Sequence, residues 1–327
     1  MALMDAPVTM EWESRLGRRL RVRDLYILST VVTAGGMAKA ARQLAITQPA
    51  VSSAIANLEH LLGVSLLDRN SHGVEPTIFA EAVLKRSAAV FDELKQSVRD
   101  VEFLADPTRG EVRLRCHDTV AATILPDIIR RFSAKYPGVV MQIDSVASAT
   151  TALPALRNRE CDIIIGRLHI PIRDENLNVE ILFDDHLAVV AGQHNRLVRR
   201  RKIDLAELID EHWILQAPYT WNYLGLKEAF QARGLPMPKA SLVTLSTPLI
   251  FEFLTNGPYI TAYPRSVALH RSLKVLPVDL PMRPWSLAIV VLKNRTLSPV
   301  VERFMESVRE VAKLPVGKVR PRKMRSI

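Results

Sequence analysis

Residues 40–55, AARQLAITQPAVSSAI, have the pattern of two helices joined by a tight turn. Before the turn, two alanines and Leu44 follow helical spacing and form a small apolar face. Thr47 is placed to cap the next helix by accepting a hydrogen bond from a free backbone N–H. Pro49 falls in the first turn of that helix, where a missing N–H costs little. This stretch therefore predicts a helix-turn-helix.

The second helix of the pair has an apolar face and a polar face. Its apolar positions recur every three or four residues and predict burial of that side; they are Val51, Ile55, Leu58, Leu61 and Leu62. The other side carries small or amide side chains, which can approach base edges in a major groove without a clash; they are Gln48, Ser52, Ser53, Ala56 and Asn57. This is the layout of a DNA-reading helix-turn-helix, although two packed helices without that role can share it.

The flanking segments favour the DNA-reading interpretation. Residues 24–32 form one more amphipathic helix, and Gly35-Gly36 supply the chain reversal after it. Residues 66–77 have the pattern of a hairpin with turn residues at its tip. Such a hairpin is typical of the wing in winged domains, and Arg69 on it is placed to meet a phosphate.

Residues 20–77 resemble the N-terminal winged helix-turn-helix of LysR-type transcriptional regulators. The resemblance rests on motifs in the same order and spacing, at residues 40–44, 47–52, 55–59, 62–64, 67–69 and 76–77. The chain departs from the family pattern at Gly35-Gly36-Met37, where a Ser usually follows the Gly, and at Ser53, where Arg or Lys is common. The residues that the resemblance implies in DNA binding are Met37, Thr47, Gln48, Pro49, Ala50, Ser52, Ser53, Asn57 and Arg69.

The length of the chain indicates how many domains it has, and its net charge indicates the class of partner. A chain of 327 residues suggests two or three domains. A formal net charge of +10 favours acidic partners such as nucleic acid. The basic residues gather outside the helix-turn-helix, however, at residues 18–23, 199–202 and 318–325. The net charge therefore supports DNA binding only as a background.

Residues 1–15 show no basic segment followed by an apolar one, and we expect a loose N-terminus rather than a secretory signal. The longest apolar runs, such as residues 287–292, have the length of a strand. We therefore expect a soluble, cytoplasmic protein with no membrane partner. Cys116 and Cys161 are expected to be buried small hydrophobes, and their spacing does not support a redox or metal role.

Residues 77–104 predict one long helix, capped by Thr77. Apolar side chains recur along it at heptad spacing; they are Leu84, Phe91, Leu94, Val98, Val101 and Ala105. We interpret residues 80–106 as a dimerisation helix, with packing on the chain's own core as the alternative. A homodimer or homotetramer would turn paired recognition helices toward one side of a duplex.

Residues 107–110 contain Pro and Gly and predict a hinge. Strands then alternate with helices over residues 111–314, which indicates mostly parallel sheets covered by helices. We expect two lobes, one of residues 111–190 and 273–314 and one of residues 191–272, before a basic tail of residues 315–327. This order resembles the effector domain of the same family, which is similar to periplasmic solute-binding proteins. The resemblance implies a multidomain α/β chain: winged helix-turn-helix, linker helix and two-lobed effector domain.

Open α/β sheets bind ligands beyond the carboxyl ends of their strands, so a cleft between two such lobes predicts a small-molecule site. The candidate effector-binding residues all lie at such strand ends; they are Asp118, Thr119, Val120, Ser145, Ser148, Gly166, Arg167, Ser246 and Thr247. Each Ser or Thr could equally be an ordinary helix cap. Arg167 could pair a carboxylate or phosphate, or be a surface charge.

No spacing of residues typical of a metal site, a nucleotide-binding loop or a nucleophile elbow occurs, so we expect neither a cofactor nor an enzyme. The function implied is a LysR-type regulator whose promoter binding is modulated by a small-molecule effector, with RNA polymerase as a further partner. Two alternatives stay open. One is a ligand-binding module with a degenerate DNA reader, and the other is a hydrolase that uses the cleft.

Overall fold

The computed structural model describes residues 19–70, 73–168, 172, 174–282 and 284–314. The chain divides into two compact units, Met1–Lys95 and Gln96–Ile327. The expected loose N-terminus at residues 1–15 and the basic tail at residues 315–327 lie outside the described residues.

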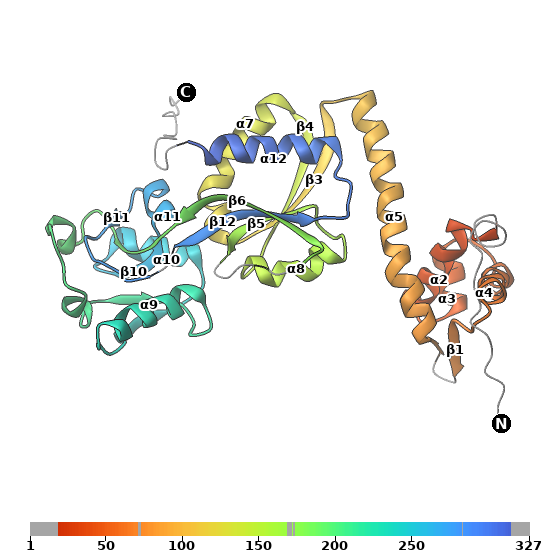
Figure 1. Ribbon diagram of the computed structural model, residues 1–327, viewed down its shortest axis with the longest axis horizontal. Helices are drawn as coiled ribbons and strands as arrows, with labels where there is room; N and C mark the ends of the chain where they lie inside the picture. The colour runs from red at the N-terminus through yellow and green to blue at the C-terminus, as the bar shows by residue number, and fades with distance from the viewer. Residues whose placement is uncertain (1–18, 71–72, 169–171, 173, 283, 315–327) are drawn as a thin grey trace. The chain divides into compact units, whose positions relative to one another are not determined.

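The first unit is a helix-turn-helix with a two-stranded wing (Figure 1). Its elements are α2 (Val22–Ala34), α3 (Met37–Gln43), α4 (Gln48–Leu62), β1 (Leu67–Asn70) and β2 (Gly73–Pro76), with β1 and β2 antiparallel. Thr47 caps α4 as predicted, because its hydroxyl accepts from the N–H of Ala50 at 3.4 Å. The turn between α3 and α4 places Ala45 at a φ of 53°, and Gly35 closes α2 at a φ of 69°. Both residues make the sharp reversals that separate the helices.

The apolar face of α4 packs on α2, α3 and the start of the wing. The buried side chains of this core include Leu28, Val31, Ala40, Val51, Ile55, Leu58 and Leu66. Glu59 of α4 accepts hydrogen bonds from the N–H groups of Leu66 and Leu67, at 2.8 and 3.3 Å. These bonds attach the first strand of the wing to the helix beside it.

Helix α5 (Ile78–Ala105) follows the wing and is capped by Thr77, whose hydroxyl accepts from the N–H of Ala80. The apolar seam of this helix divides into two parts. Leu84 and Phe91 pack against the core of the first unit, where Phe91 meets the ring of Tyr26 edge-on. For these two residues the alternative, packing on the chain's own core, is correct. Five other apolar side chains of this helix are 41–77% exposed; they are Val90, Leu94, Val98, Val101 and Leu104.

The second unit begins with a shorter break than predicted. Strand β3 (Arg109–Cys116) already includes Arg109 and Gly110, so only residues 106–108 separate it from α5. The predicted hinge at residues 107–110 is therefore wrong in its second half. Gly110 pairs with Val139 of the neighbouring strand because its hydrogen bonds continue the parallel ladder.

The first lobe of this unit is a five-stranded sheet in the order β4-β3-β5-β12-β6. Its other strands are β4 (Gly138–Ser145), β5 (Ile163–Leu168), β6 (Leu177–Asp185) and β12 (Trp285–Leu292). Its helices are α6 (Asp118–Ala121), α7 (Ile124–Lys135), α8 (Ala149–Arg157) and α12 (Pro299–Ala312). Figure 1 shows α7 and α12 on one face of the sheet and α8 on the other, and each face has its own apolar cluster.

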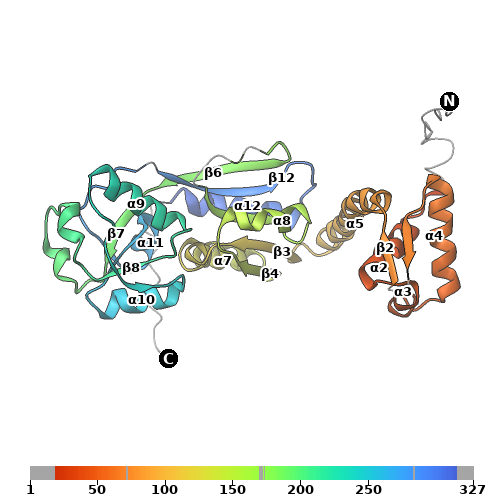
Figure 2. The ribbon, with the colours of Figure 1, turned by 90° about the horizontal axis from the view of Figure 1, so that it is seen from below.

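The second lobe is a five-stranded sheet in the order β11-β7-β10-β8-β9. Its strands are β7 (Leu187–Ala191), β8 (Trp213–Leu215), β9 (Ala240–Val243), β10 (Ile260–Pro264) and β11 (Lys274–Val275). Its helices are η2 (Arg196–Arg199), η3 (Leu205–Leu208), α9 (Trp221–Ala232), α10 (Thr247–Asn256) and α11 (Arg265–His270). Figure 2 shows α9 and α10 on opposite sides of β7 and β8, and their apolar residues belong to separate clusters.

The lobe boundaries differ from the predicted ones. Strands β7 and β11 both pair within the second sheet, whereas the prediction assigned them to the first lobe. The chain crosses between lobes at His186 and again between β11 and β12, since β6 and β12 are hydrogen-bonded in the first sheet. Hydrophobic runs alone could not locate these crossings, because an apolar strand pattern does not say to which sheet the strand is hydrogen-bonded.

Each sheet is mixed, with three adjacent parallel strands. The parallel sets are β4-β3-β5 in the first lobe and β10-β8-β9 in the second. The next strand in each sheet, β12 and β7, runs antiparallel to its set, and the fifth strands, β6 and β11, pair antiparallel with β12 and β7. Within the described residues, no helix is long and apolar enough to cross a membrane.

Candidate functional site

The outer face of α4 presents the polar surface that the sequence predicts. The exposed residues on it are Thr47, Gln48, Pro49, Ala50, Ser53, Ala56 and Asn57. Ser52 is half-buried, and its hydroxyl lies 3.2 Å from the sulfur of Met37. The free hydroxyl and amide groups on this face can reach base edges and backbone oxygens of a duplex.

Two of the predicted DNA-binding residues are placed differently. The side chain of Met37 is only 8% exposed and belongs to the core of the first unit, so its assignment as a DNA-binding side chain is wrong. An apolar side chain at the start of α3 packs inward because that helix lies against α2 and α4. Arg69 lies on β1, and its side chain is outside the described part of the structure.

The second unit contains a cleft of about 500 Å³ between its lobes. The cleft lies where the parallel strands of both sheets end, as expected for open α/β sheets. The first lobe contributes residues after β3 and β4 and near the end of β5, and the second contributes residues after β8 and β9 and at the end of β10.

Five predicted residues line this cleft: Asp118, Thr119, Ser145, Ser148 and Arg167. Ser148 also caps α8, where its hydroxyl accepts from the N–H of Thr151 at 3.1 Å. The alternative of an ordinary helix cap therefore applies to it as well.

The other four predicted residues do not line the cleft. Val120 is fully buried in the core of the first lobe. Gly166 lies under α8, where a Cβ would come within 2.7 Å of the Cβ of Ala149. Ser246 is an exposed cap of α10, and Thr247 lines a separate hollow of about 560 Å³ beside that helix. Val120, Ser246 and Thr247 do follow strand ends, but their side chains do not line the cleft, and Gly166 lies inside β5 and has no side chain.

Several cleft residues were missed by the sequence reasoning, among them His117, Gln216, Thr220, Trp221 and Trp285. His117 and Gln216 directly follow β3 and β8, so the strand-end rule could have found them. Trp285 carried no such signal, since it begins β12 directly after the segment in which the chain crosses between the lobes.

Arg167 is the centre of a buried polar network on the cleft wall. Its guanidinium donates to Asp185 at 3.1 Å and to the hydroxyls of Thr119 at 3.0 Å and Ser266 at 2.9 Å. Asp185 also accepts from the backbone N–H of Ser266. Burial lowers the pKa of the Arg167 guanidinium from its usual value, and the charge of Asp185 opposes this shift. Asp185 thus already neutralises the Arg167 guanidinium, which the sequence suggested as a partner for an anionic ligand.

His117 contributes a neutral ring to the same wall. Its Nδ1 accepts from the backbone N–H of Thr119 at 3.1 Å. Burial, with the nearby charge of Arg167, lowers the pKa of His117 from its usual value. The neutral ring therefore carries its proton on Nε2. The neighbouring Asp118 also lines the cleft, and its carboxylate forms no ion pair with a cation among the described residues.

Neither cysteine is placed for redox chemistry. Both are buried, and burial raises the pKa of Cys116 to about 12 and that of Cys161 to about 11. Among the described residues, no group of three or more His, Cys, Asp or Glu side chains could hold a metal ion.

Comparison with known families agrees with both units. The model described as LysR substrate binding domain matches residues 105–313. The model described as bacterial regulatory helix-turn-helix protein, lysR family, matches residues 22–81. The chain belongs to the LysR family. It is a LysR-type DNA-binding transcriptional regulator with an effector-binding domain, and a regulator rather than an enzyme.

Similar LysR-family proteins span nearly the whole chain. The HTH-type transcriptional regulator TdcA of Escherichia coli strain K12 is 24% identical over 293 residues, which cover 89% of this chain and 93% of TdcA. A full-length OxyR from Pseudomonas aeruginosa has a TM-score of 0.58 at 18% identity and covers 90% of this chain and 95% of its own. Full-length CbnR complexed with its target DNA has a TM-score of 0.50 at 21% identity, covering 90% of this chain and 100% of its own. At these identities, the solved structures support the fold.

Proposed function

We propose that this LysR-family regulator binds promoter DNA as a homodimer or homotetramer, and that a small molecule in the interlobe cleft changes that binding. The observation that carries the proposal is the cleft itself. It opens at the carboxyl ends of both parallel strand sets and is lined from both lobes, on a chain that also has an exposed polar recognition helix. CbnR, which has the same fold, is described as complexed with its target DNA.

The lining of the cleft favours a neutral or cationic effector that carries hydrogen-bonding groups. Arg167 is paired with Asp185, while Asp118 remains as a negative charge. Hydroxyl and amide groups line both walls, together with the rings of Tyr219, Trp221 and Trp285. Aromatic faces attract cations, and a carboxylate would lack a free partner among these described residues.

A ligand that contacts both lobes can shift the equilibrium between their arrangements, provided that it binds one arrangement better. In a dimer, that shift would change the spacing or bend of the bound DNA. Dimerisation is supported by the exposed apolar residues in the second half of α5, because a solvated helix needs no such stripe.

We also propose the functional division of the chain: a DNA-binding domain at residues 16–79, a linker helix at 80–106 and an effector domain from 111 to 314. A cytoplasmic location and contact with RNA polymerase follow from the same proposed role.

The test is a footprint of the full chain on DNA upstream of its own gene, measured over a salt series. We expect a protected site with two-fold symmetry that outcompetes random DNA as salt rises. Ser53→Glu, on the exposed face of α4, should weaken the footprint by about tenfold or more, because it sets a carboxylate against phosphates. Ser241→Glu, on exposed β9, is the matched control and should leave the footprint intact.

Diffuse protection that disappears at modest salt would show only phosphate attraction and would contradict the regulator proposal. A sharp footprint then provides the assay for the effector. Matched amine and carboxylate compounds of one ring skeleton should differ, with only the amine changing the footprint.

A further inference from the structure

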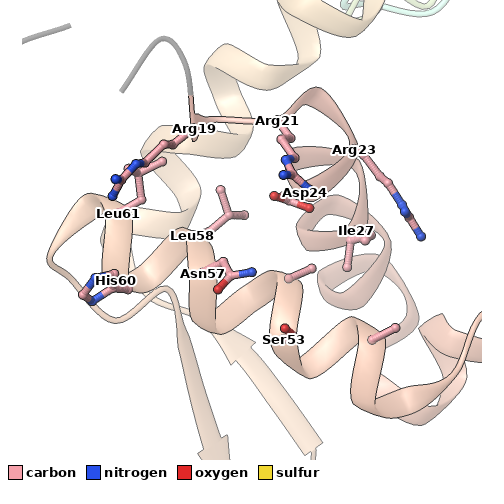
Figure 3. Close-up of a pocket in the computed structure, with 12 residues that line it drawn as sticks. Arg19, Arg21, Arg23, Asp24, Ile27, Ser53, Asn57, Leu58, His60 and Leu61 are labelled. Atoms are coloured by element: carbon pink, nitrogen blue, oxygen red, sulfur yellow. The ribbon is translucent and has the colours of Figure 1, made fainter. Parts of the chain in front are cut away.

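The first unit contains a hollow of about 450 Å³ between the start of α2 and the outer side of α4. One wall comes from residues 19–27 and the other from residues 50–61. Figure 3 shows Arg19 reaching toward Leu61 of α4 and Arg21 pointing down beside Asp24, with Asn57 and Ser53 on the α4 wall. Ser53 and Asn57 are also on the predicted DNA-binding face.

The hollow is strongly basic. Arg19, Arg21 and Arg23 line it and are all exposed, whereas Asp24 is its only acidic lining residue. None of these three arginines forms an ion pair with a carboxylate in the part of the chain that the structure describes. Three cationic side chains left unpaired at one rim form an anion-binding surface.

The recognition helix itself lacks the charges that DNA binding requires. Residues 48–62 contain neither lysine nor arginine and include Glu59. Hydroxyl and amide groups can contact bases, but affinity for a duplex comes largely from Lys and Arg that neutralise phosphates. The cations nearest to the outer side of α4 in this hollow are the arginines that precede and begin α2.

We propose that Arg19, Arg21 and Arg23 bind phosphates of the DNA strand that passes beside α4, while Ser53 and Asn57 hydrogen-bond to the same backbone. The proposal rests on the DNA binding proposed above and adds a phosphate clamp to it. Arg19 and Arg21 precede residue 22, where the match to the family's helix-turn-helix begins, and Arg23 lies within that match.

The test uses the full chain and a duplex of random sequence, about 30 base pairs long, so that no operator has to be known. Dissociation constants are measured by fluorescence anisotropy over a salt series. The test variant is Arg19→Gln/Arg21→Gln/Arg23→Gln. The control, Arg199→Gln/Arg201→Gln/Lys202→Gln, removes the same charge from exposed positions in the second unit. A third variant is Arg19→Lys/Arg21→Lys/Arg23→Lys.

Each phosphate contact contributes about 0.9 to the slope of log K against log salt. The Gln variant should therefore lower the magnitude of the slope by about 2 to 3 and weaken binding at least about tenfold near 0.1 M salt. The control should stay within about twofold of the unmodified chain, and the Lys variant should keep the slope. Equal melting curves by circular dichroism would show that all variants are folded.

An unchanged slope in the Gln variant, or an equal loss in the control, would overturn the clamp while leaving promoter binding in place. If the triple Gln variant does not fold, Arg19→Gln/Arg21→Gln decides, because a clamp loses about 1 to 2 of the slope when these two exposed arginines are neutralised, and a surface without DNA contact loses none. Failure of the unmodified chain to bind any duplex would instead overturn the proposed function.

Discussion

The guanidinium of Arg167 lies 3.1 Å from a carboxylate oxygen of Asp185, with 8% and 3% of the two side chains exposed. Arg167 comes from β5 of the first lobe, and Asp185 ends β6 where the chain crosses to the second. Because Ser266 of α11 joins the same network, this pair also connects the lobes beside the cleft. A ligand contact at Thr119 would act on the same network, since Arg167 donates to that hydroxyl.

Removal of the cation should destabilise the second unit strongly. Arg167→Met leaves Asp185 buried without its charged partner, which costs roughly 3–5 kcal/mol of unfolding free energy. Urea unfolding followed by tryptophan fluorescence measures the loss. Arg233→Met breaks an ion pair with Asp279 whose side chains are 41% and 82% exposed, and should cost less than about 1 kcal/mol. Similar losses in the two variants would contradict the structural role of Arg167.

Stability should depend on pH through His117. Burial lowers the pKa of His117 in the folded chain. At a pH below the usual histidine pKa of about 6.5, the unfolded chain therefore binds a proton more readily than the folded chain does. The free energy of unfolding should thus fall as the pH drops below that value, and His117→Gln should reduce the fall. His194→Gln, at an exposed position, serves as the control. Denaturation curves at several pH values test this, and an NMR titration that found the pKa of His117 above about 6.5 would refute it.

The two cysteines should be inert in the folded protein. Their burial and raised pKa values, about 12 for Cys116 and about 11 for Cys161, leave little thiolate at neutral pH. A thiol reagent such as DTNB should label neither in the native chain and both in guanidinium chloride. Ser145→Cys, at an exposed site that lines the cleft, should react promptly and serves as the positive control. Rapid labelling of the unmodified native chain would contradict this expectation.

The exposed apolar stripe on α5 should hold the oligomer together. Val98 and Val101 are 59% and 67% exposed, and lysines at both positions would place charges in a helix–helix interface. We expect Val98→Lys/Val101→Lys to raise the dimer dissociation constant by about a hundredfold or more, as measured by analytical ultracentrifugation. Val243→Lys, at a valine of β9 that is also 59% exposed, should leave the association unchanged. A double variant that assembles normally would show that α5 is not the interface.

The sequence predicted the first unit closely, because the helix caps and the apolar spacing that define this unit are local features. Thr47 caps α4, Gly35 closes α2, and the apolar spacing of Val51, Ile55 and Leu58 places them in the core. Each feature depends on residues within one or two turns of a helix. Met37 was assigned wrongly because its burial depends on how α3 packs against two other helices.

The cleft was only partly predictable. The strand-end rule found Asp118, Thr119 and Ser145, but it could not tell them from Val120, whose side chain turns into the core. Trp285 reaches the cleft from a strand more than a hundred residues away from α6. Side-chain direction and long-range crossings depend on tertiary packing, which no local spacing encodes.

By itself, the sequence determined the order of elements, the helix-turn-helix with its caps and wing, and the family resemblance, because hydrophobic period and capping act over a few residues. The tertiary structure alone decided where the charges act. It paired Arg167 with Asp185, left Asp118 in the cleft, and brought Arg19 and Arg21 beside a recognition helix that has no cation of its own. Electrostatic interaction depends on distance and burial in space, and folding sets both for residues that are far apart in the chain.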